Sequence, residues 1–275
     1  MTVFEPGLYR GVPEAIYHGD RGSISSSQAR RLLEVSPYRW RTELNTPRKP
    51  SPDMEWGTAL HTLVLGTGAL VIDTGAEKWT TDAVKADVAD IRRRGHIPLR
   101  PKDFAAVNAA ATAVRAHGYA SLLFDSGEAE LSAWAPDPAS EVMMRARADW
   151  VRWEGQGRAR LVDLKTTSEL GPASWMWSVA KYGYHAQEAW YRDVFELCGV
   201  EVVGFTFVVV TNSAPFEVFT SELHPRAVDL GRDRNAAALD IYAGCAAVNE
   251  WPSHGEQVFS IDIPEKYYRR QEFMS

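Results

Sequence analysis

The segment that most constrains the fold is R-L-V-D-L-K-T-T, residues 160–167, because it reads as a buried β-strand and yet carries two charges in its apolar run. Asp163 and Lys165 lie two residues apart in this segment. Side chains two apart on a strand leave the same face of the sheet, so the acid and the amine are expected to lie together. The sheet that contains this strand must therefore accommodate a pair of charges beside its core.

The preceding strand, M-M-R-A-R-A-D-W-V-R-W, is expected to bring a second acid to this pair. The loop E-G-Q-G-R joins the two strands, and a turn symmetric about Gln156 sets Asp149 opposite Asp163. Directly opposed side chains have Cβ atoms about 4.5–5.5 Å apart, so two carboxylates there repel each other unless a cation intervenes. Such oxygen ligands suit Mg²⁺ or Mn²⁺. Lys165 would then orient or deprotonate an attacking water, or offset charge in the transition state of phosphodiester cleavage.

A third acid lies one strand earlier, in G-E-A-E-L-S-A-W. Glu130 is the candidate, and Glu128, on the same strand face, competes with it for the role. A partly buried ion-pair network would explain an isolated D-x-K tripeptide, but acids on three consecutive strands favour a functional site. Arg145 and Arg147 carry odd numbers, as Asp149 does, and are expected on its face, where they reach a phosphate or only neutralise carboxylates.

Composition narrows the class of protein. The 275 residues are 45% hydrophobic and 24% charged, as in ordinary globular domains. Two cysteines are too few for a disulfide framework, a four-thiolate zinc site or an iron–sulfur cluster. A formal net charge of -6 argues against coating of nucleic acid by bulk charge, although it permits a local basic groove. Without a secretory signal or an apolar run of about 18 residues, we expect a cytoplasmic protein with no membrane association.

Hydrophobic periodicity predicts an α/β fold with a mixed central sheet flanked by helices. Helices are expected over residues 26–36, over 55–66, over two stretches between about 80 and 124 joined by the basic turn 92–102, over 173–197 with a bend near 182–184, and over 226–248. Three strands are expected between residues 128 and 167, and two more on either side of N-S-A-P. Residues 6–20 should be irregular or form a short hairpin.

We interpret the chain as one domain with three parts. These are a mainly helical N-terminal part over 1–124, a catalytic sheet and helix over 125–222, and a C-terminal helix and tail over 223–275. The tryptophans Trp175, Trp177, Trp190 and Trp251 are expected to pack in the interior rather than to stack on bases.

Several motifs occur in an order that resembles the RecB-type nucleases of the PDDEXK superfamily. In chain order they are G-T-A-L-H, G-E-A-E-L-S-A-W, R-A-R-A-D-W, V-D-L-K-T-T and H-A-Q-E-A-W-Y. The segments P-G-L-Y-R-G-V-P-E-A-I-Y-H-G-D and I-S-S-S-Q-A-R-R-L-L-E-V-S-P-Y-R-W further resemble the opening of the RecE-like, exodeoxyribonuclease VIII-type exonucleases of phages and prophages. The resemblance covers most of residues 6–215.

The resemblance implies a PDDEXK core and a metal-dependent exonuclease. Such an enzyme degrades one strand of linear double-stranded DNA in the 5′ to 3′ direction, exposing single strand for phage-type recombination. The implied partners are double-stranded DNA ends and a single-strand annealing protein, and the implied assembly is a homo-oligomeric ring. Ser36-Pro37 stands where cluster-bearing relatives have Cys-Pro, so no iron–sulfur cluster is implied.

The resemblance also implies roles for individual residues. One or two Mg²⁺ or Mn²⁺ ions would be held by His61, Asp149, Asp163 and the carbonyl of Leu164, with Lys165 as the catalytic lysine. Gln187 and Tyr191, one helical turn apart, would position the substrate strand or the outer shell of the metal.

Each assignment has a structural alternative. His61 would also suit a satisfied core histidine, and Gln187 and Tyr191 a packed pair on one helix face. The basic runs 30–41 and 92–102 are either phosphate contacts or solvated helix faces. For the whole chain, the alternatives are a catalytically weak DNA-end-binding protein and a structure-specific endonuclease on the same fold.

Overall fold

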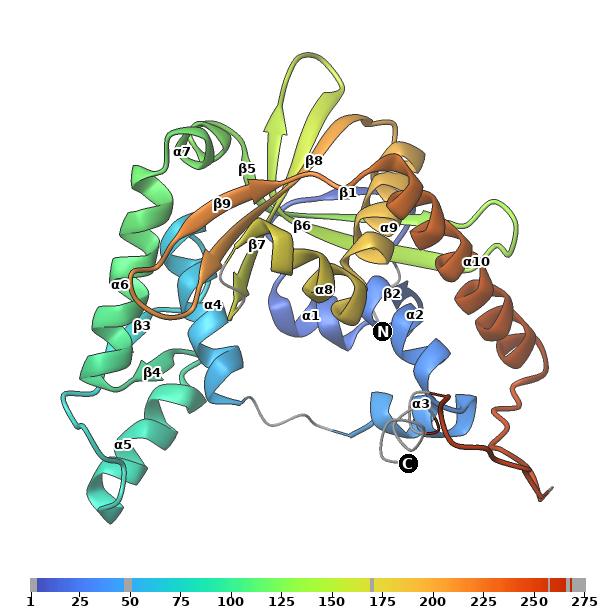
Figure 1. Ribbon diagram of the computed structural model, residues 1–275, viewed down its shortest axis with the longest axis horizontal. Coiled ribbons are helices and arrows are strands. Elements are labelled where there is room, and N and C mark those ends of the chain that lie inside the picture. Colours follow the sequence, from blue (N-terminus) through green and yellow to red (C-terminus); the bar gives the residue numbers. More distant parts are fainter. Residues whose placement is uncertain (1–3, 47–50, 169–170, 257, 266–267, 269–275) are drawn as a thin grey trace.

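A seven-stranded mixed sheet forms the centre of the computed structural model, which describes residues 4–46, 51–168, 171–256, 258–265 and 268 (Figure 1). Its order is β1-β5-β6-β7-β8-β9, and β2 pairs with β6. The β7–β8 and β2–β6 pairs are parallel and the others antiparallel. The strands are β1 (Gly7–Tyr9), β2 (Ile24–Ser25), β5 (Glu128–Pro136), β6 (Met143–Trp153), β7 (Arg158–Thr167), β8 (Glu201–Thr211) and β9 (Val218–Ser221).

Strand β8 is apolar along most of its length because both faces of the sheet are covered. In β8, Phe205, Phe207 and Val209 belong to one core cluster, whereas Val208 and Val210 belong to the other. A strand that faces the core on both sides reads as a continuous apolar run rather than an alternating one. This is the environment in which β7 holds its two charged side chains.

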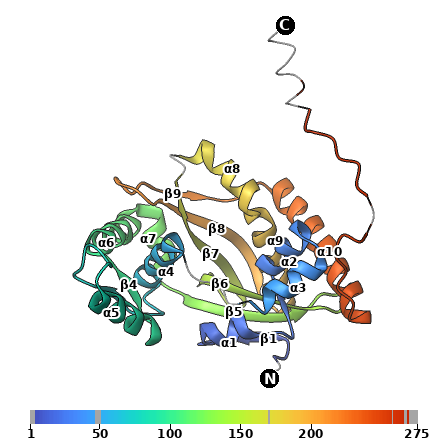
Figure 2. The same ribbon diagram turned by 90° about the horizontal axis from the view of Figure 1, so that it is seen from below.

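Each face of the sheet carries its own helices (Figures 1 and 2). The first face is covered by α2 (Ser26–Glu34), α9 (Tyr184–Leu197) and α10 (Pro225–Val248). The second is covered by α4 (Pro52–Leu65), α6 (Pro101–Ala116) and α7 (Gly118–Phe124). The remaining helices are α1 (Glu14–Gly19), α3 (Pro37–Leu44), α5 (Asp82–Arg93) and α8 (Pro172–Tyr182). Within the described residues, none of these helices combines the length and the apolar character needed to cross a membrane.

Local signals set the helix boundaries. The Gln28 side chain accepts a hydrogen bond from the Ser25 amide at 2.9 Å, which satisfies a backbone donor at the start of α2. Gly66 closes α4 with φ of 71°, and Gly183 separates α8 from α9 with φ of 68°. Glycine adopts this left-handed conformation without the steric cost of a Cβ atom. The bend expected near 182–184 is therefore a complete break between two helices.

Two regions differ from the sequence-based expectation. The expected turn over 92–102 contains a strand, β4 (Ile97–Leu99), which pairs in parallel with β3 (Val71–Asp73). Ile97 and Leu99 are buried in the second core cluster, which is why this short segment is ordered as a strand despite its basic flanks. The opening segment, expected to be irregular or a short hairpin, instead contributes β1 to the edge of the main sheet beside β5.

Candidate active site

The acid and the amine of β7 lie in contact, as the two-residue spacing predicts. Lys165 Nζ is 2.5 Å from Asp163 Oδ2. The Asp163 side chain is only 2% exposed and that of Lys165 17% exposed, so the pair borders the core but reaches a surface through the amine. The site thus holds a desolvated carboxylate and a partly accessible ammonium group.

The register of β6 and β7 brings Asp149 to this pair. Trp150 pairs with Val162 and Val151 with Leu161, which is the register predicted from a turn centred on Gln156. Asp149 is the next position along β6, and its Oδ2 accepts a hydrogen bond from the amide of Leu164 at 2.8 Å. The strand pairing therefore delivers a second carboxylate to the same end of β7.

Burial and the second carboxylate control the protonation of the pair. Burial raises the pKa of Asp163 to about 6; the Lys165 ammonium group opposes this shift and the Asp149 carboxylate adds to it. Burial alone would lower the pKa of Lys165, but the charges of Asp163 and Asp149 outweigh it and raise that pKa. Both groups are consequently charged at neutral pH.

His61 approaches from the opposite side of the sheet, on α4. Its Nε2 lies 2.8 Å from the carbonyl oxygen of Leu164, and its Nδ1 lies 3.5 Å from Asp149 Oδ2. The imidazole is 30% exposed, so it is not a fully enclosed core histidine. It bridges a backbone carbonyl of β7 and a carboxylate of β6.

Helix α9 supplies the contacts on the other side of the pair. Gln187 Nε2 donates to Asp163 Oδ1 at 2.6 Å, and the side chain of Gln187 also hydrogen-bonds Tyr191, whose pKa burial raises well above its usual value. Lys165 Nζ lies 4.9 Å from the ring centroid of Tyr184. Sequence reasoning missed Tyr184, although its position three residues before Gln187 places both side chains on one face of the helix.

The two candidate acids of β5 have different surroundings. Glu128 is bound by Arg10, whose Nη2 donates at 2.7 Å, and by Trp153 Nε1 at 2.8 Å. Glu130 falls across from Asp149 in the register of β5 and β6 and has φ of 52°. Within the described residues, no hydrogen bond joins the Glu130 carboxylate to the site. Because Glu128 is bound by Arg10 and Trp153, Glu130 is the favoured candidate of the two. The role of Glu130 stays a prediction.

Arg145 is directed into the interior of the protein. Its side chain is 1% exposed, donates to Ser23 Oγ at 2.9 Å and to Gln28 Oε1 at 3.0 Å, and lies 4.0 Å from Asp20 Oδ2. A guanidinium enclosed in this way is not accessible to a phosphate. Of the two roles considered for Arg145, the geometry therefore favours neutralisation of a nearby carboxylate.

Arg147 and the basic runs are also largely engaged within the protein. Arg147 donates to Ser132 Oγ at 2.9 Å and to the carbonyl of Val12 at 2.7 Å. In the two runs, ion pairs recur at 2.9 Å and 2.7 Å, as in Arg31–Glu43 and Arg92–Glu55. These contacts favour the interpretation of both runs as solvated, ion-paired helix faces.

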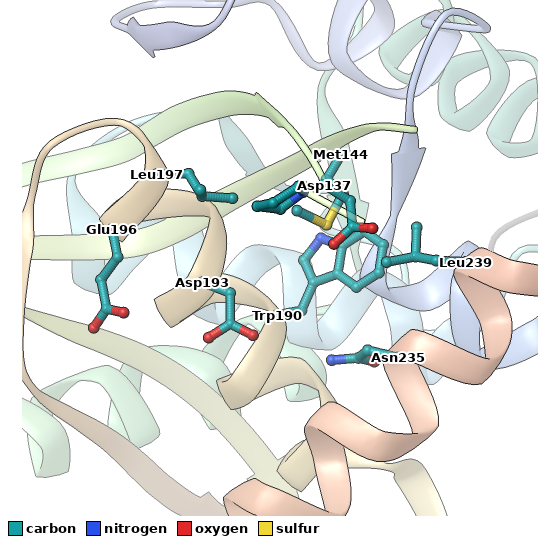
Figure 3. A pocket seen from close by; sticks show the side chains of 9 residues that line it. Asp137, Met144, Trp190, Asp193, Glu196, Leu197, Asn235 and Leu239 are labelled. Carbon is teal, nitrogen blue, oxygen red and sulfur yellow. The ribbon is translucent and has the colours of Figure 1, made fainter. Parts of the chain in front are cut away.

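A cavity of about 390 Å³ is lined by residues of α9 and α10 (Figure 3). Asp193 of α9 and Asn235 of α10 line it together with Trp190, whereas none of the predicted site residues does. Its wall includes several acids, so it offers no cationic group to a phosphate. The chemistry of β7, rather than the size of this hollow, locates the candidate active site.

The residues around β7 fit a small divalent cation. Within the described residues, no group of three or more His, Cys, Asp or Glu side chains is arranged to hold an ion on its own, but here a backbone carbonyl completes the donor set. His61 Nε2 and Leu164 O lie 2.8 Å apart, within hydrogen-bonding distance of each other, and would add a nitrogen and an oxygen donor. The carboxylates of Asp149 and Asp163 supply the negative charge.

Comparison with known families identifies the domain. A family model described as a PDDEXK-like domain of unknown function, DUF3799, matches residues 25–263. The chain belongs to the DUF3799 family. The predicted fold, a PDDEXK core with a mixed sheet between helices, is thereby confirmed. A search of curated proteins finds no match to this DUF3799 chain.

Solved structures support the same fold. The DUF3799 chain is similar to the crystal structure of a candidate exonuclease from Eubacterium rectale, with a TM-score of 0.62 and 11% identity over 94% of this chain and 98% of that one. A phage-related exonuclease from Haemophilus somnus 129PT gives a TM-score of 0.35 at 10% identity, over 83% and 96% of the two chains. The first likeness establishes a shared fold, and the second is too low to establish one. PDDEXK nucleases as a group use divalent metal ions, in keeping with the donor set around β7.

Proposed function

We propose that this chain is a metal-dependent exodeoxyribonuclease that degrades one strand of linear double-stranded DNA. The observation that carries the proposal is the contact between Lys165 and Asp163 beside Asp149, on a PDDEXK-like fold. Two carboxylates and an ammonium group at one end of a strand are the groups that hydrolysis of a phosphodiester requires, since the reaction must bind a cation and stabilise added negative charge.

Asp149, Asp163, His61 and the carbonyl of Leu164 would hold the ion. When bound, a divalent ion lowers the pKa of a coordinated water and neutralises charge on the phosphate. Lys165, charged and 17% exposed, orients the attacking water and offsets the negative charge that develops on the phosphate oxygens.

The supporting residues fix this geometry. Gln187 donates to Asp163 Oδ1 and leaves Oδ2 to Lys165, so the carboxylate cannot rotate without losing a contact. The Leu164 amide does the same for Asp149. Such contacts hold ligands in the orientation that the ion needs, and their loss typically costs about 10–100-fold in metal affinity or activity.

The finer features of the proposal come from the sequence resemblance to RecE-like exonucleases. They are Mg²⁺ or Mn²⁺ as the ion with one or two per site, digestion from 5′ to 3′, a ring-like homo-oligomer, and a single-strand annealing protein as partner in recombination. The family match begins at residue 25, after the first of the two opening segments on which the RecE-like resemblance depends. These features therefore rest on fewer matched residues than the nuclease fold does.

The test is digestion of an end-labelled linear duplex and of a covalently closed circle of the same sequence. We expect Mg²⁺-dependent loss of the linear substrate from one strand, no cleavage of the circle, and no reaction with a chelator. Lys165→Ala should abolish digestion, whereas Lys85→Ala, which removes an exposed lysine paired with Asp82, should not. Cleavage of the circle would favour a structure-specific endonuclease, and binding of ends without cleavage would favour an end-binding protein.

A further inference from the structure

The helix that follows the catalytic strand presents an apolar face to solvent. On α8, Met176 is 61% and Trp177 69% exposed, although the sequence predicts that Trp177 packs in the interior. Trp175, two residues earlier, is 3% exposed and does pack, so only one side of α8 is used by the core. Lys181 lies one turn after Trp177, and side chains four apart in a helix are neighbours on its surface.

A series of aromatic contacts connects this face to the candidate active site. Lys165 Nζ lies 4.9 Å from the Tyr184 ring centroid, the Tyr184 and Tyr182 centroids are 5.7 Å apart, and Lys181 Nζ lies 5.0 Å from the Tyr182 centroid. Trp175 stacks on Tyr184 at 5.2 Å and anchors the inner side of the helix. The exposed face is therefore continuous with the surroundings of Lys165, and α8 lies on the outside of the fold (Figure 2).

We propose that this face, defined as Met176, Trp177 and Lys181, binds unpaired nucleotides of the strand at the active site. An indole stacks on any base, and the lysine contacts a phosphate of the same strand. The proposal rests on the proposed function, because it takes DNA as the substrate.

The combination of groups favours a nucleic acid strand over a second copy of the chain. Large exposed apolar groups mark interaction surfaces, and Lys181, one helical turn after Trp177, makes this one complementary to a polyanion. A two-fold contact of the face with itself would instead bring two Lys181 side chains together, because such interfaces pair the same patch on both subunits. With a net charge of -6, the chain also relies on local cations of this kind to attract DNA.

The test is equilibrium binding of a labelled oligothymidylate, followed by fluorescence anisotropy with Ca²⁺ in place of Mg²⁺ and with strand integrity checked on a gel. Trp177→Ala should weaken binding about 5- to 100-fold, and Trp177→Phe should restore much of it, since stacking needs only an aromatic ring. The matched control is Tyr119→Ala on α7, which removes a 44% exposed aromatic ring far from α8 and should leave binding unchanged.

Salt dependence separates stacking from charge. Lys181→Ala should reduce the slope of log affinity against log salt by about 0.7, the value for one phosphate contact with a single strand. Trp177→Ala should leave that slope unchanged while lowering affinity at every salt concentration. A slope that changes equally in both variants would contradict the assigned roles.

The outcomes also separate this inference from the proposed function. The role of α8 is overturned if the wild-type chain digests duplex but binds no oligothymidylate. It is also overturned if Trp177→Ala binds oligothymidylate as tightly as the wild type does. Either result leaves the proposed nuclease activity intact. A third contrary result is that Trp177→Ala sediments as a smaller species while its protomer keeps the wild-type affinity for oligothymidylate. That result would assign the face to a contact between copies of the chain and would also overturn the role of α8 in binding DNA. A wild-type chain that neither digests nor binds DNA removes the proposed function itself.

Discussion

Arg145 and Lys165 are cations on the neighbouring strands β6 and β7, each beside an aspartate, but their surroundings differ. Arg145 is 1% exposed and lies near Asp20, which accepts hydrogen bonds from Trp134 Nε1 at 3.0 Å and from the Gly22 amide at 2.8 Å. Burial alone would raise the pKa of Asp20, but these hydrogen bonds and the arginine outweigh it and lower that pKa. The Asp20 carboxylate thus has its partners within the protein, although the buried Nε of Arg145 has no hydrogen-bond partner among the described residues.

The charges of the β7 cluster, formed by Asp163, Lys165 and Asp149, are less completely neutralised among the described residues. Burial raises the pKa of Asp163 to about 6, the Asp149 carboxylate adds to this shift, and the Lys165 ammonium group offsets only part of the effect of burial. A buried carboxylate in this condition is stabilised by an added cation, whereas one that is already satisfied is not. We therefore interpret the under-neutralised cluster as the candidate functional site and the satisfied cluster of similar burial as structural.

The largest expected effect is on activity at the under-neutralised cluster. Lys165→Ala should lower the turnover of linear duplex by about 10²- to 10⁴-fold, because it removes a positioned catalytic group. Its free energy of unfolding should fall by less than its activation free energy rises, because Asp163, whose pKa burial already raises, can take up a proton once the ammonium group is removed. Urea denaturation followed by fluorescence would measure the change in stability. If Lys165→Ala lost its activity because it no longer folds, the β7 cluster would be structural in the same way as the Arg145 cluster.

The second effect is on stability at the satisfied cluster. Arg145→Ala should lower the free energy of unfolding by about 3–5 kcal/mol, because it leaves the buried Asp20 carboxylate without its cation. The control is Arg158→Ala, which removes a 53% exposed arginine that pairs with Glu201 at 3.1 Å and should cost less than about 1 kcal/mol. Equal unfolding midpoints for the two variants would contradict a structural role for Arg145.

Local rules predict much of this fold because the decisive pairings are local. The loop around Gln156 joins adjacent strands, so its symmetry suffices to predict the β6–β7 register. Alternation of faces did not by itself reveal the partners of Arg145 and Arg147, which donate to Ser23 and Ser132 within the protein. Ala148 and Val151, three residues apart, pack in the same core cluster, so the regular alternation that would group odd-numbered residues ends near Asp149.

Local patterns predicted the candidate site where a motif lies on one element or on two strands joined by a short loop. The spacing of Asp163 and Lys165 fixes their contact, since a strand repeats every two residues. Tyr184 contacts Lys165 only because α9 packs across β7, and no local pattern encodes that packing. Trp177 is apolar but exposed, so burial inferred from residue type alone was wrong for it.

A third prediction sharpens the comparison by loosening one contact of Asp163. Gln187→Ala should raise the Mg²⁺ concentration needed for half-maximal digestion about 10- to 100-fold, because the carboxylate loses the hydrogen bond that orients it. Tyr191→Phe, which removes the hydroxyl that hydrogen-bonds Gln187, should shift the metal requirement in the same direction by a smaller factor. A fall in maximal rate at an unchanged metal requirement would assign Gln187 to the substrate strand instead.

The smallest expected effect tests a buried acid outside both clusters. Glu188 of α9 is 1% exposed, and burial raises its pKa to about 7 against the opposing charge of Arg192. Between about pH 6 and pH 8 the folded chain releases a proton that the unfolded chain has already lost, so the free energy of unfolding should fall by about 1.4 kcal/mol. Glu188→Gln should flatten this slope in urea denaturation at the two pH values, whereas Glu201→Gln, at an exposed position, should not. Asp163, with a pKa of about 6, accounts for only a small part of this slope, so a slope that is unchanged in Glu188→Gln would contradict the assignment to Glu188.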